Sequence, residues 1–233
     1  MRRQVKREWL DSLPPDDTTA IRSRRDLRRV NAWMGNPRTL AHALQSAANG
    51  QPLRTLVELG SGDGHLLLQV ARHLSPPARN ARVLLLDRLS LVNSETEAAF
   101  RQTGWRAEPI REDVFDWLRR AGSEPVDALV ANLFLHHFTD DQLRELFRLA
   151  ARRASVLVAV EPRRSSPAVM FSRLLWAIGC NSVTRHDAVV SVGAGFAGSE
   201  LAALWPSAPA GRWNLAEESA GLFGHLFMAK LNR

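Results

Sequence analysis

The sequence of 233 residues contains a single cysteine, Cys180, which excludes a disulfide scaffold within the chain and a cysteine-based zinc site. Tyrosine is absent, and lysine occurs only at Lys6 and Lys230. No apolar run is long enough to span a bilayer, and the chain does not open with the charged and apolar regions of a signal peptide. We therefore expect a cytoplasmic location and no metal centre.

Arginine supplies nearly all of the positive charge, and the formal net charge is +7. Five arginines recur at helical spacing near the N-terminus: Arg22, Arg24, Arg25, Arg28 and Arg29. The same helical pattern leaves Ile21, Leu27 and Val30 on another side, so we interpret the arginines as a solvated face. An anionic membrane surface is the alternative partner. Nucleic acid is not expected, because the chain lacks an RNA-binding module and a lysine-rich tail.

A glycine-rich segment follows an apolar run and precedes an apolar helical pattern. Its residues are Glu58, Gly60, Ser61, Gly62, Asp63 and Gly64. Alternating glycines let the backbone approach a ligand closely, and the N–H groups of the following helix start point to the same place. The Gly-Lys-Ser/Thr of a phosphate-binding loop is absent, and His65 replaces the third glycine of dinucleotide-binding proteins. The acidic residues would repel a pyrophosphate, so the segment favours a cationic ligand.

Further polar residues follow the ends of the next expected strands. Asp87 lies about 20 residues beyond the glycine segment, where an acidic residue can accept hydrogen bonds from ribose hydroxyls. Asp113 follows a weaker strand pattern, and it could equally cap a helix that begins at Val114. Asn132 ends an apolar strand and is followed directly by Leu133. The carboxyl ends of parallel strands meet at one edge of a sheet, so these residues are expected to share a site.

In this order and spacing, the segments resemble the motifs of class I methyltransferases, and the resemblance covers residues 53–162. It implies S-adenosylmethionine (SAM) as the cofactor, a sulfonium and ammonium compound without phosphate. Besides the six residues of the glycine segment, the implied cofactor-binding residues are Asp87, Arg88, Asp113, Val114, Asn132 and Leu133. In the family, the aspartate at the position of Asp113 meets the adenine amino group.

Alternating strand and helix patterns predict an α/β protein. With the resemblance, this becomes a Rossmann-like class I methyltransferase fold with helices on both faces of a mostly parallel seven-stranded sheet and an antiparallel final strand. We expect residues 1–50 to form an N-terminal helical extension or lid, and residues 51–233 to form the methyltransferase domain. The final strand is expected at 222–231, antiparallel to one near 212–218. The segment 187–204 fits a strand or a buried helix.

The methyl acceptor is expected to be small and apolar, because an aliphatic and aromatic helix pattern begins at Pro167, in a segment that often covers the substrate pocket in this family. The Asn-Pro-Pro-Tyr typical of enzymes that methylate nucleobase or glutamine nitrogens is absent after Ala131, which leaves an oxygen or carbon acceptor. A phenol has a pKa of about 10, so a histidine base would help it to react. The candidate bases are His186, His136 and His137.

The outer segments are similar to those of small bacterial methyltransferases of the ubiquinone-biosynthesis type, some of which O-methylate phenolic lipids. The similar segments are 25–27, 31–36 and 184–188. This resemblance implies transfer to a phenolic oxygen in bacterial secondary metabolism. Two alternatives stay open: an RNA methyltransferase, which the positive charge favours, and a non-catalytic SAM-binding partner protein. The sequence gives no oligomeric state.

Overall fold

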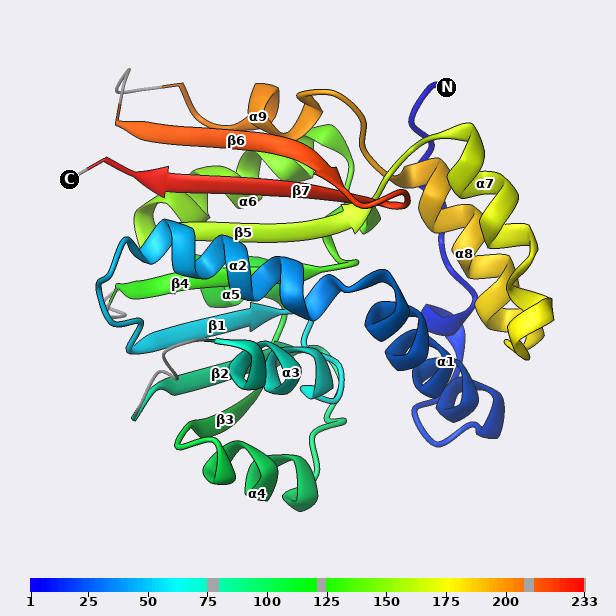
Figure 1. Ribbon diagram of the computed structural model, residues 1–233, viewed down its shortest axis with the longest axis horizontal. Helices are drawn as coiled ribbons and strands as arrows, with labels where there is room; N and C mark the ends of the chain where they lie inside the picture. The colour runs from blue at the N-terminus through cyan, green and yellow to red at the C-terminus, as the bar shows by residue number, and fades with distance from the viewer. Residues whose placement is uncertain (75–79, 121–124, 208–211, 233) are drawn as a thin grey trace.

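One seven-stranded sheet organises the computed structural model, which describes residues 1–74, 80–120, 125–207 and 212–232 (Figure 1). The strand order is β3-β2-β1-β4-β5-β7-β6. The strands are β1 Thr55–Leu59, β2 Arg82–Asp87, β3 Arg106–Arg111, β4 Val126–Asn132, β5 Ala154–Pro162, β6 Trp213–Ala220 and β7 Gly224–Leu231. The first five pair in parallel, and β7 is antiparallel to β5 and β6. The predicted mixed sheet with its antiparallel final strand is therefore confirmed.

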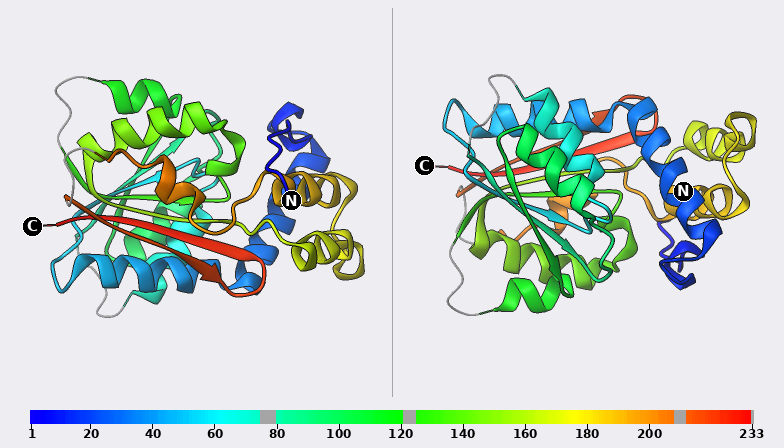
Figure 2. Two further views of the ribbon diagram at one scale, coloured as in Figure 1. Left: turned by 90° about the horizontal axis from the view of Figure 1, so that it is seen from above. Right: turned by 90° about the horizontal axis from the view of Figure 1, so that it is seen from below.

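Helices cover both faces of this sheet (Figure 2). One layer consists of α2 Asn36–Ala48, α3 His65–His73 and α4 Ser94–Gln102, and the other consists of α5 Val114–Arg119, α6 Asp140–Arg153 and α9 Glu200–Leu204. Each layer has its own apolar core against the sheet, with Leu44, Leu67 and Phe100 in the first and Trp117 and Leu146 in the second. Because both faces are covered, the central strands β4 and β5 are apolar along most of their length.

Three more helices form a lobe beyond the carboxyl ends of β1, β4 and β5 (Figures 1 and 2). They are α1 Thr18–Met34, α7 Ser166–Arg173 and α8 Ser182–Ala194. Short 3-10 helices accompany them: η1 Leu10–Ser12, η2 Leu135–His137 and η3 Leu175–Ile178. Among the described helices, none combines the length and the apolar character needed to cross a bilayer.

The first two long helices belong to different parts of the molecule. Asp17 caps α1 by accepting hydrogen bonds from the N–H groups of Thr19 and Ala20. Gly35 then ends α1 in the left-handed conformation with a φ of 74°, and α2 begins at the next residue. α1 joins the lobe, whereas α2 packs on the sheet with Leu40 fully buried. How the chain divides into independent folding units stays a prediction, but by packing α2 belongs to the sheet.

Two segments differ in detail from their expected structure. The strand alternative for 187–204 is wrong, because the segment lies in α8 and α9 with a break at Gly195. A side chain at Gly195 would lie 2.2 Å from the backbone oxygen of Pro162, so only glycine fits this close approach. The helix expected to begin at Pro167 ends as α7 at Arg173, and the tighter η3 follows it.

Candidate functional site

The glycine segment forms a tight turn between β1 and α3. Gly60, Gly62 and Gly64 all have positive φ, and the N–H groups of Gly60 and Ser61 donate to the backbone oxygen of Leu86. The turn borders a cavity of about 690 Å³ at the carboxyl edge of the sheet. Glu58, Asn132 and Leu133 line the same cavity, so the structure brings together the expected residues from β1 and β4.

Two polar atoms of this cavity are buried without a hydrogen-bond partner among the described residues: Oε2 of Glu58 and Oγ of Ser61. Burial raises the pKa of Glu58 well above its ordinary value, and the nearby carboxylates of Asp63 and Asp87 raise it further. An orphaned carboxylate in a cavity is costly unless a cation or a hydrogen-bond donor reaches it. The residues present therefore fit a ligand that brings positive charge.

The aspartates after β2 and β3 hold the loops of this edge. The two oxygens of Asp87 accept from the N–H groups of Gly62 and Leu89, each at 2.8 Å. Asp113 accepts from Phe115 N–H at 2.8 Å and so caps α5, which confirms its capping role. Asp87 keeps lone pairs for a ribose, but its contact with SAM and that of Asp113 stay predictions.

The other two expected cofactor residues differ in exposure. Val114, the first residue of α5, is buried in the core, whereas the side chain of Arg88 is exposed in the loop after β2. Neither lines the 690 Å³ cavity. Their assignment to the cofactor stays a prediction from the family resemblance.

Helix α1 lies directly on the glycine turn. Arg28 donates from Nε and Nη2 to the same carboxylate oxygen of Asp63, at 2.8 and 2.5 Å, and Arg24 and Leu27 also line the cavity. Arg28 stays exposed, as expected of a solvated face, but it also pairs with Asp63, and Arg24 is only partly exposed. Helical spacing identifies which arginines share a side, but an ion pair across 35 residues depends on the tertiary fold.

Three asparagines connect the lobe to the end of β4. The side chain of Asn36 donates to Asn31 at 2.8 Å and to Asn132 at 2.9 Å, and Asn132 donates to Asn31 at 3.0 Å. Asn36 is 1% exposed, so these bonds replace its contacts with water. The cluster fixes the turn between α1 and α2 at the cavity. Of the three, only Asn132 was predicted as a site residue.

A second, narrower cavity of about 90 Å³ lies between α1, α7 and α8. Its lining is mostly apolar and includes Val30, Met34, Phe171, Leu175 and Phe223. Leu27 and Leu133 line both cavities, so the two adjoin at these side chains. Leu133 has a φ of 51°, which is unusual for a leucine and holds its side chain at this junction.

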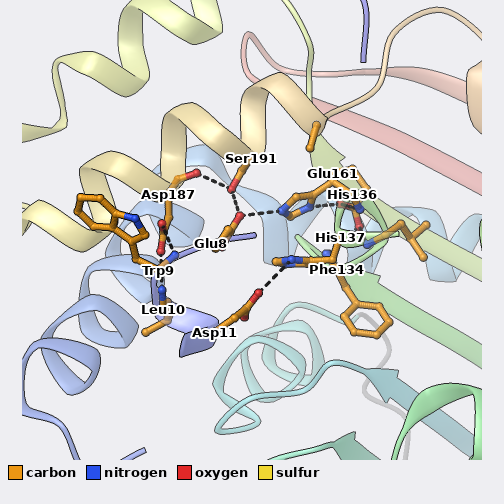
Figure 3. Close-up of polar contacts among 12 residues, drawn as sticks. Glu8, Trp9, Leu10, Asp11, Phe134, His136, His137, Glu161, Asp187 and Ser191 are labelled. Atoms are coloured by element: carbon orange, nitrogen blue, oxygen red, sulfur yellow. Dashed lines mark hydrogen bonds and ion pairs between the residues drawn. The ribbon is translucent and has the colours of Figure 1, made fainter. Parts of the chain in front are cut away.

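His136 is buried between two carboxylates (Figure 3). Its Nδ1 lies 2.8 Å from Oε2 of Glu161, and its Nε2 lies 3.2 Å from Oε1 of Glu8. Burial lowers the pKa of His136, but the hydrogen bonds to Glu161 and Glu8 outweigh it and raise the pKa to about 9. His136 is therefore an imidazolium at neutral pH, with both nitrogens donating to carboxylates.

The other two candidate bases lie on either side of this group. The ring of His137 lies against that of His136 with centroids 4.3 Å apart and planes tilted by 33°, and its Nδ1 lies 3.6 Å from Oδ2 of Asp11. Burial and the charge of His136 lower the pKa of His137. His186 stacks on Trp9 with ring centroids 3.7 Å apart. None of the three histidines lines the apolar cavity.

The first twelve residues bind across the lobe, a contribution that sequence reasoning missed. Arg3 donates to the backbone oxygens of Ala194, His136 and Phe138. Glu8 accepts from Ser191 Oγ and lines the apolar cavity. The sequence offers no periodic or spacing signal for this extended segment. Only the fold brings Glu8 to a histidine 128 residues away.

Glu8, His136 and His137 place three possible metal ligands within 4.8 Å of one another. Here Nε2 of His136 and Oε1 of Glu8 bond each other directly, so the group is arranged as an ion pair. Asp187 completes the anchoring of the N-terminal segment, because it accepts from the N–H groups of Trp9 and Leu10.

A sequence model described as a methyltransferase domain matches residues 56–155. No curated protein matches the sequence significantly. Among solved structures, the plantazolicin methyltransferase BpumL in complex with SAH gives a TM-score of 0.66 at 12% identity, over 93% of this chain and 92% of that chain.

Two further similar structures belong to longer proteins. The mitomycin 7-O-methyltransferase MmcR gives a TM-score of 0.58 at 17% identity, and human N-acetylserotonin methyltransferase in complex with SAM gives 0.56 at 12%. The matches cover 96% and 97% of this chain but only 60% and 63% of those proteins. Residues 56–155 thus match a methyltransferase domain, and the sheet order and the similar structures show the Rossmann-like fold of class I, SAM-dependent methyltransferases.

Proposed function

We propose that the protein transfers a methyl group from SAM to an oxygen of a small apolar acceptor, most simply a phenol. The observation that carries this proposal is the pair of adjoining cavities. One contains the glycine turn and has a mixed polar and apolar lining, and the other is apolar and lies between α1, α7 and α8. Leu27 and Leu133 mark the junction where the sulfonium of one ligand would meet the nucleophile of the other.

The cofactor side is supported by the unpartnered atoms of Glu58 and Ser61. SAM carries a sulfonium and an ammonium group, and a buried carboxylate with one unpartnered oxygen favours such charges. SAM supplies an already activated methyl group, so the chain's contribution is to hold the two reactants in line and to exclude water.

The acceptor side is supported by the apolar cavity lining and by a carboxylate within it. Glu8 lines the cavity, and its Oε1 is bonded to the imidazolium of His136, which Glu161 orients. We propose that Glu8 takes the acceptor's hydroxyl proton as the oxygen–methyl bond forms and the sulfur–methyl bond breaks. Before the transfer, the positive charge of His136 keeps Glu8 in its carboxylate form. The three histidines stay the candidates that the sequence predicts.

The first experiment is incubation of the protein with labelled SAM and a panel of phenols, quinols and fatty acyl resorcinols, read by mass spectrometry. We expect a product that is heavier by one methyl group on oxygen. A product methylated on carbon or nitrogen would contradict the proposed acceptor atom, and no product with any acceptor would favour a SAM-binding partner protein without catalysis.

The role of Glu8 has its own test. Glu8→Gln should lower kcat by about 100-fold or more, spare SAM binding, and be partly rescued by phenols of lower pKa, because these need less help to lose a proton. Glu218→Gln is the matched control, since Glu218 is an exposed glutamate on β6 that lines neither cavity. A normal kcat for Glu8→Gln would show that Glu8 is not the base.

The RNA methyltransferase alternative rests on the net charge of +7. Two arginines of the basic helix, Arg24 and Arg28, line the cofactor cavity instead of forming a separate basic surface. Methylation of a phenol that survives nuclease treatment would exclude an RNA requirement, whereas incorporation of label into RNA alone would establish it.

A further inference from the structure

A group of apolar side chains is exposed at the end of the lobe. Met170, Leu174, Trp176 and Ile178, which we call the tip, are 63%, 47%, 61% and 49% exposed. They come from one stretch, the end of α7 and η3, at the extremity of the molecule furthest from the sheet (Figures 1 and 2). Several exposed apolar side chains on one short stretch indicate an interaction surface.

The other side of the same stretch lines the apolar cavity. Ala168, Phe171, Ser172 and Leu175 alternate with the tip residues and face the cavity between α1, α7 and α8. Phe171 stacks on Trp33 at 4.6 Å, from the wall of the cofactor cavity. The tip and the acceptor cavity are therefore separated only by the thickness of one helical segment.

Two exposed arginines lie close to the tip in the sequence or on the neighbouring helix α8. Arg173 lies within the stretch and is exposed, and Arg185 is exposed on the first turn of α8. Burial and the nearby carboxylate of Asp26 raise the pKa of the Cys180 thiol, and Arg29 and Arg185 act on it in the opposite direction. An apolar surface containing tryptophan and bordered by arginine matches a bilayer interface, where the ring lies at the headgroup level and the cations meet anionic lipid.

We propose that the tip docks on an anionic lipid bilayer and that the acceptor is a membrane-dissolved phenol, which enters the apolar cavity through the α7–η3 segment. The docking surface stands on its own observations, whereas the acceptor class rests on the proposed function. The tip is helical and so offers no strand edge to a peptide, and its arginines would oppose a cationic partner. Its position at the end of the lobe lets it enter a membrane without a clash from the sheet.

Docking is tested by co-sedimentation of the whole protein with vesicles of phosphatidylglycerol and phosphatidylcholine in equal amounts, and with vesicles of phosphatidylcholine alone. The protein should bind the anionic vesicles more strongly, and added salt should weaken that binding. Combining Trp176→Ser with Ile178→Ser should reduce binding by about tenfold or more, because two exposed apolar side chains are lost. Leu89→Ser, another exposed apolar side chain, is the control and should bind normally.

The arginines are tested separately. Combining Arg173→Ala with Arg185→Ala should reduce binding to anionic vesicles by about 30-fold, at about 1 kcal/mol for each cation near the surface, and should not change binding to phosphatidylcholine. Arg148→Ala with Arg152→Ala, on the exposed side of α6, is the matched control. Equal losses in both pairs would show a general charge effect and would overturn the tip as the docking surface.

The acceptor class is tested by comparing a short water-soluble phenol with a long-chain phenol carried in vesicles. The tip double variant should raise KM about tenfold for the vesicle-borne phenol and leave kcat/KM for the short phenol unchanged. If no phenol reacts, the proposed function fails while the sedimentation result still decides the docking. Normal vesicle binding by the tip variant, or a wild-type dimer that the variant converts to monomers without any vesicle binding, would overturn the proposal.

Discussion

Glu161 and Glu58 are both buried carboxylates, but their surroundings differ. Glu161 accepts from the N–H groups of Phe134, Leu135 and His136 and from the His136 ring. Oε2 of Glu58 has no partner among the described residues. A fully bonded carboxylate stabilises the loop after β4, whereas an orphaned one is retained at a cost in stability. We infer that Glu58 is kept for a cationic ligand.

Glu58→Gln therefore separates binding from stability. The raised pKa means that the charged form of Glu58 costs folding stability above its ordinary pKa, so the glutamine variant without ligand should be as stable as the wild type or more stable. SAM binding should weaken by about 10- to 100-fold, the loss of a charge-assisted contact. Calorimetric titration with SAM and thermal unfolding measure the two effects. An unchanged Kd would contradict the role of Glu58.

The His136 imidazolium predicts a pH dependence of stability. The pKa of His136 is raised from 6.5 to about 9. Its contribution to the free energy of unfolding is therefore fully present below pH 6.5 and is lost as the pH rises through 9. The free energy of unfolding should fall by about 3 kcal/mol across this window, and this fall should be absent in His136→Gln. Denaturant unfolding at several pH values checks it. Equal slopes for both proteins would mean that His136 is not charged in the folded state.

At the scale of elements, α1 acts as a cover for both cavities. Leu27 lines the two of them, and Arg28 holds the helix to the glycine turn through Asp63. This ion pair is partly exposed, with 44% of the Arg28 side chain accessible, so it contributes little to global stability. Its effect is expected on the opening of the cover.

Arg28→Ala should change the free energy of unfolding by less than about 1 kcal/mol. SAM should dissociate several-fold faster, because α1 loses its tether to the turn that holds the cofactor. Added salt should speed SAM release in the wild type and have little effect in the variant, since it screens the same ion pair. Stopped-flow measurement of the off-rate tests this, with Arg25→Ala as the exposed control on the same helix. An off-rate unchanged by Arg28→Ala would leave α1 without a role in retention.

On the scale of the whole molecule, the sheet and the lobe meet at the two cavities, so a ligand there stabilises both. SAM or its demethylated product at 100 times its Kd should stabilise the fold by about 2.7 kcal/mol. For a chain of this size, that corresponds to a rise in Tm of about 5–10 °C. NAD should give no rise, because the acidic turn repels its pyrophosphate. A thermal shift with NAD but not with SAM would contradict the cofactor.

The order of the elements was predictable because it depends on local information. Apolar runs of strand length, the cap at Asp17 and the break at Gly35 are each contained within a few residues. The glycine segment was recognisable for the same reason, since positive φ at three alternate positions requires glycine in the sequence itself. The segment 187–204 was ambiguous because a short apolar run buried on all sides has no decisive period.

The sequence by itself determined the class of fold and the cofactor turn, because strand periodicity, glycine conformation and motif spacing act over short distances along the chain. Only the tertiary structure decided that α2 belongs to the sheet, that Arg28 bonds to Asp63, and that Glu8 reaches His136. These contacts join residues from distant parts of the chain. Their partners are selected by how the helices pack on the sheet, and no local pattern records that choice.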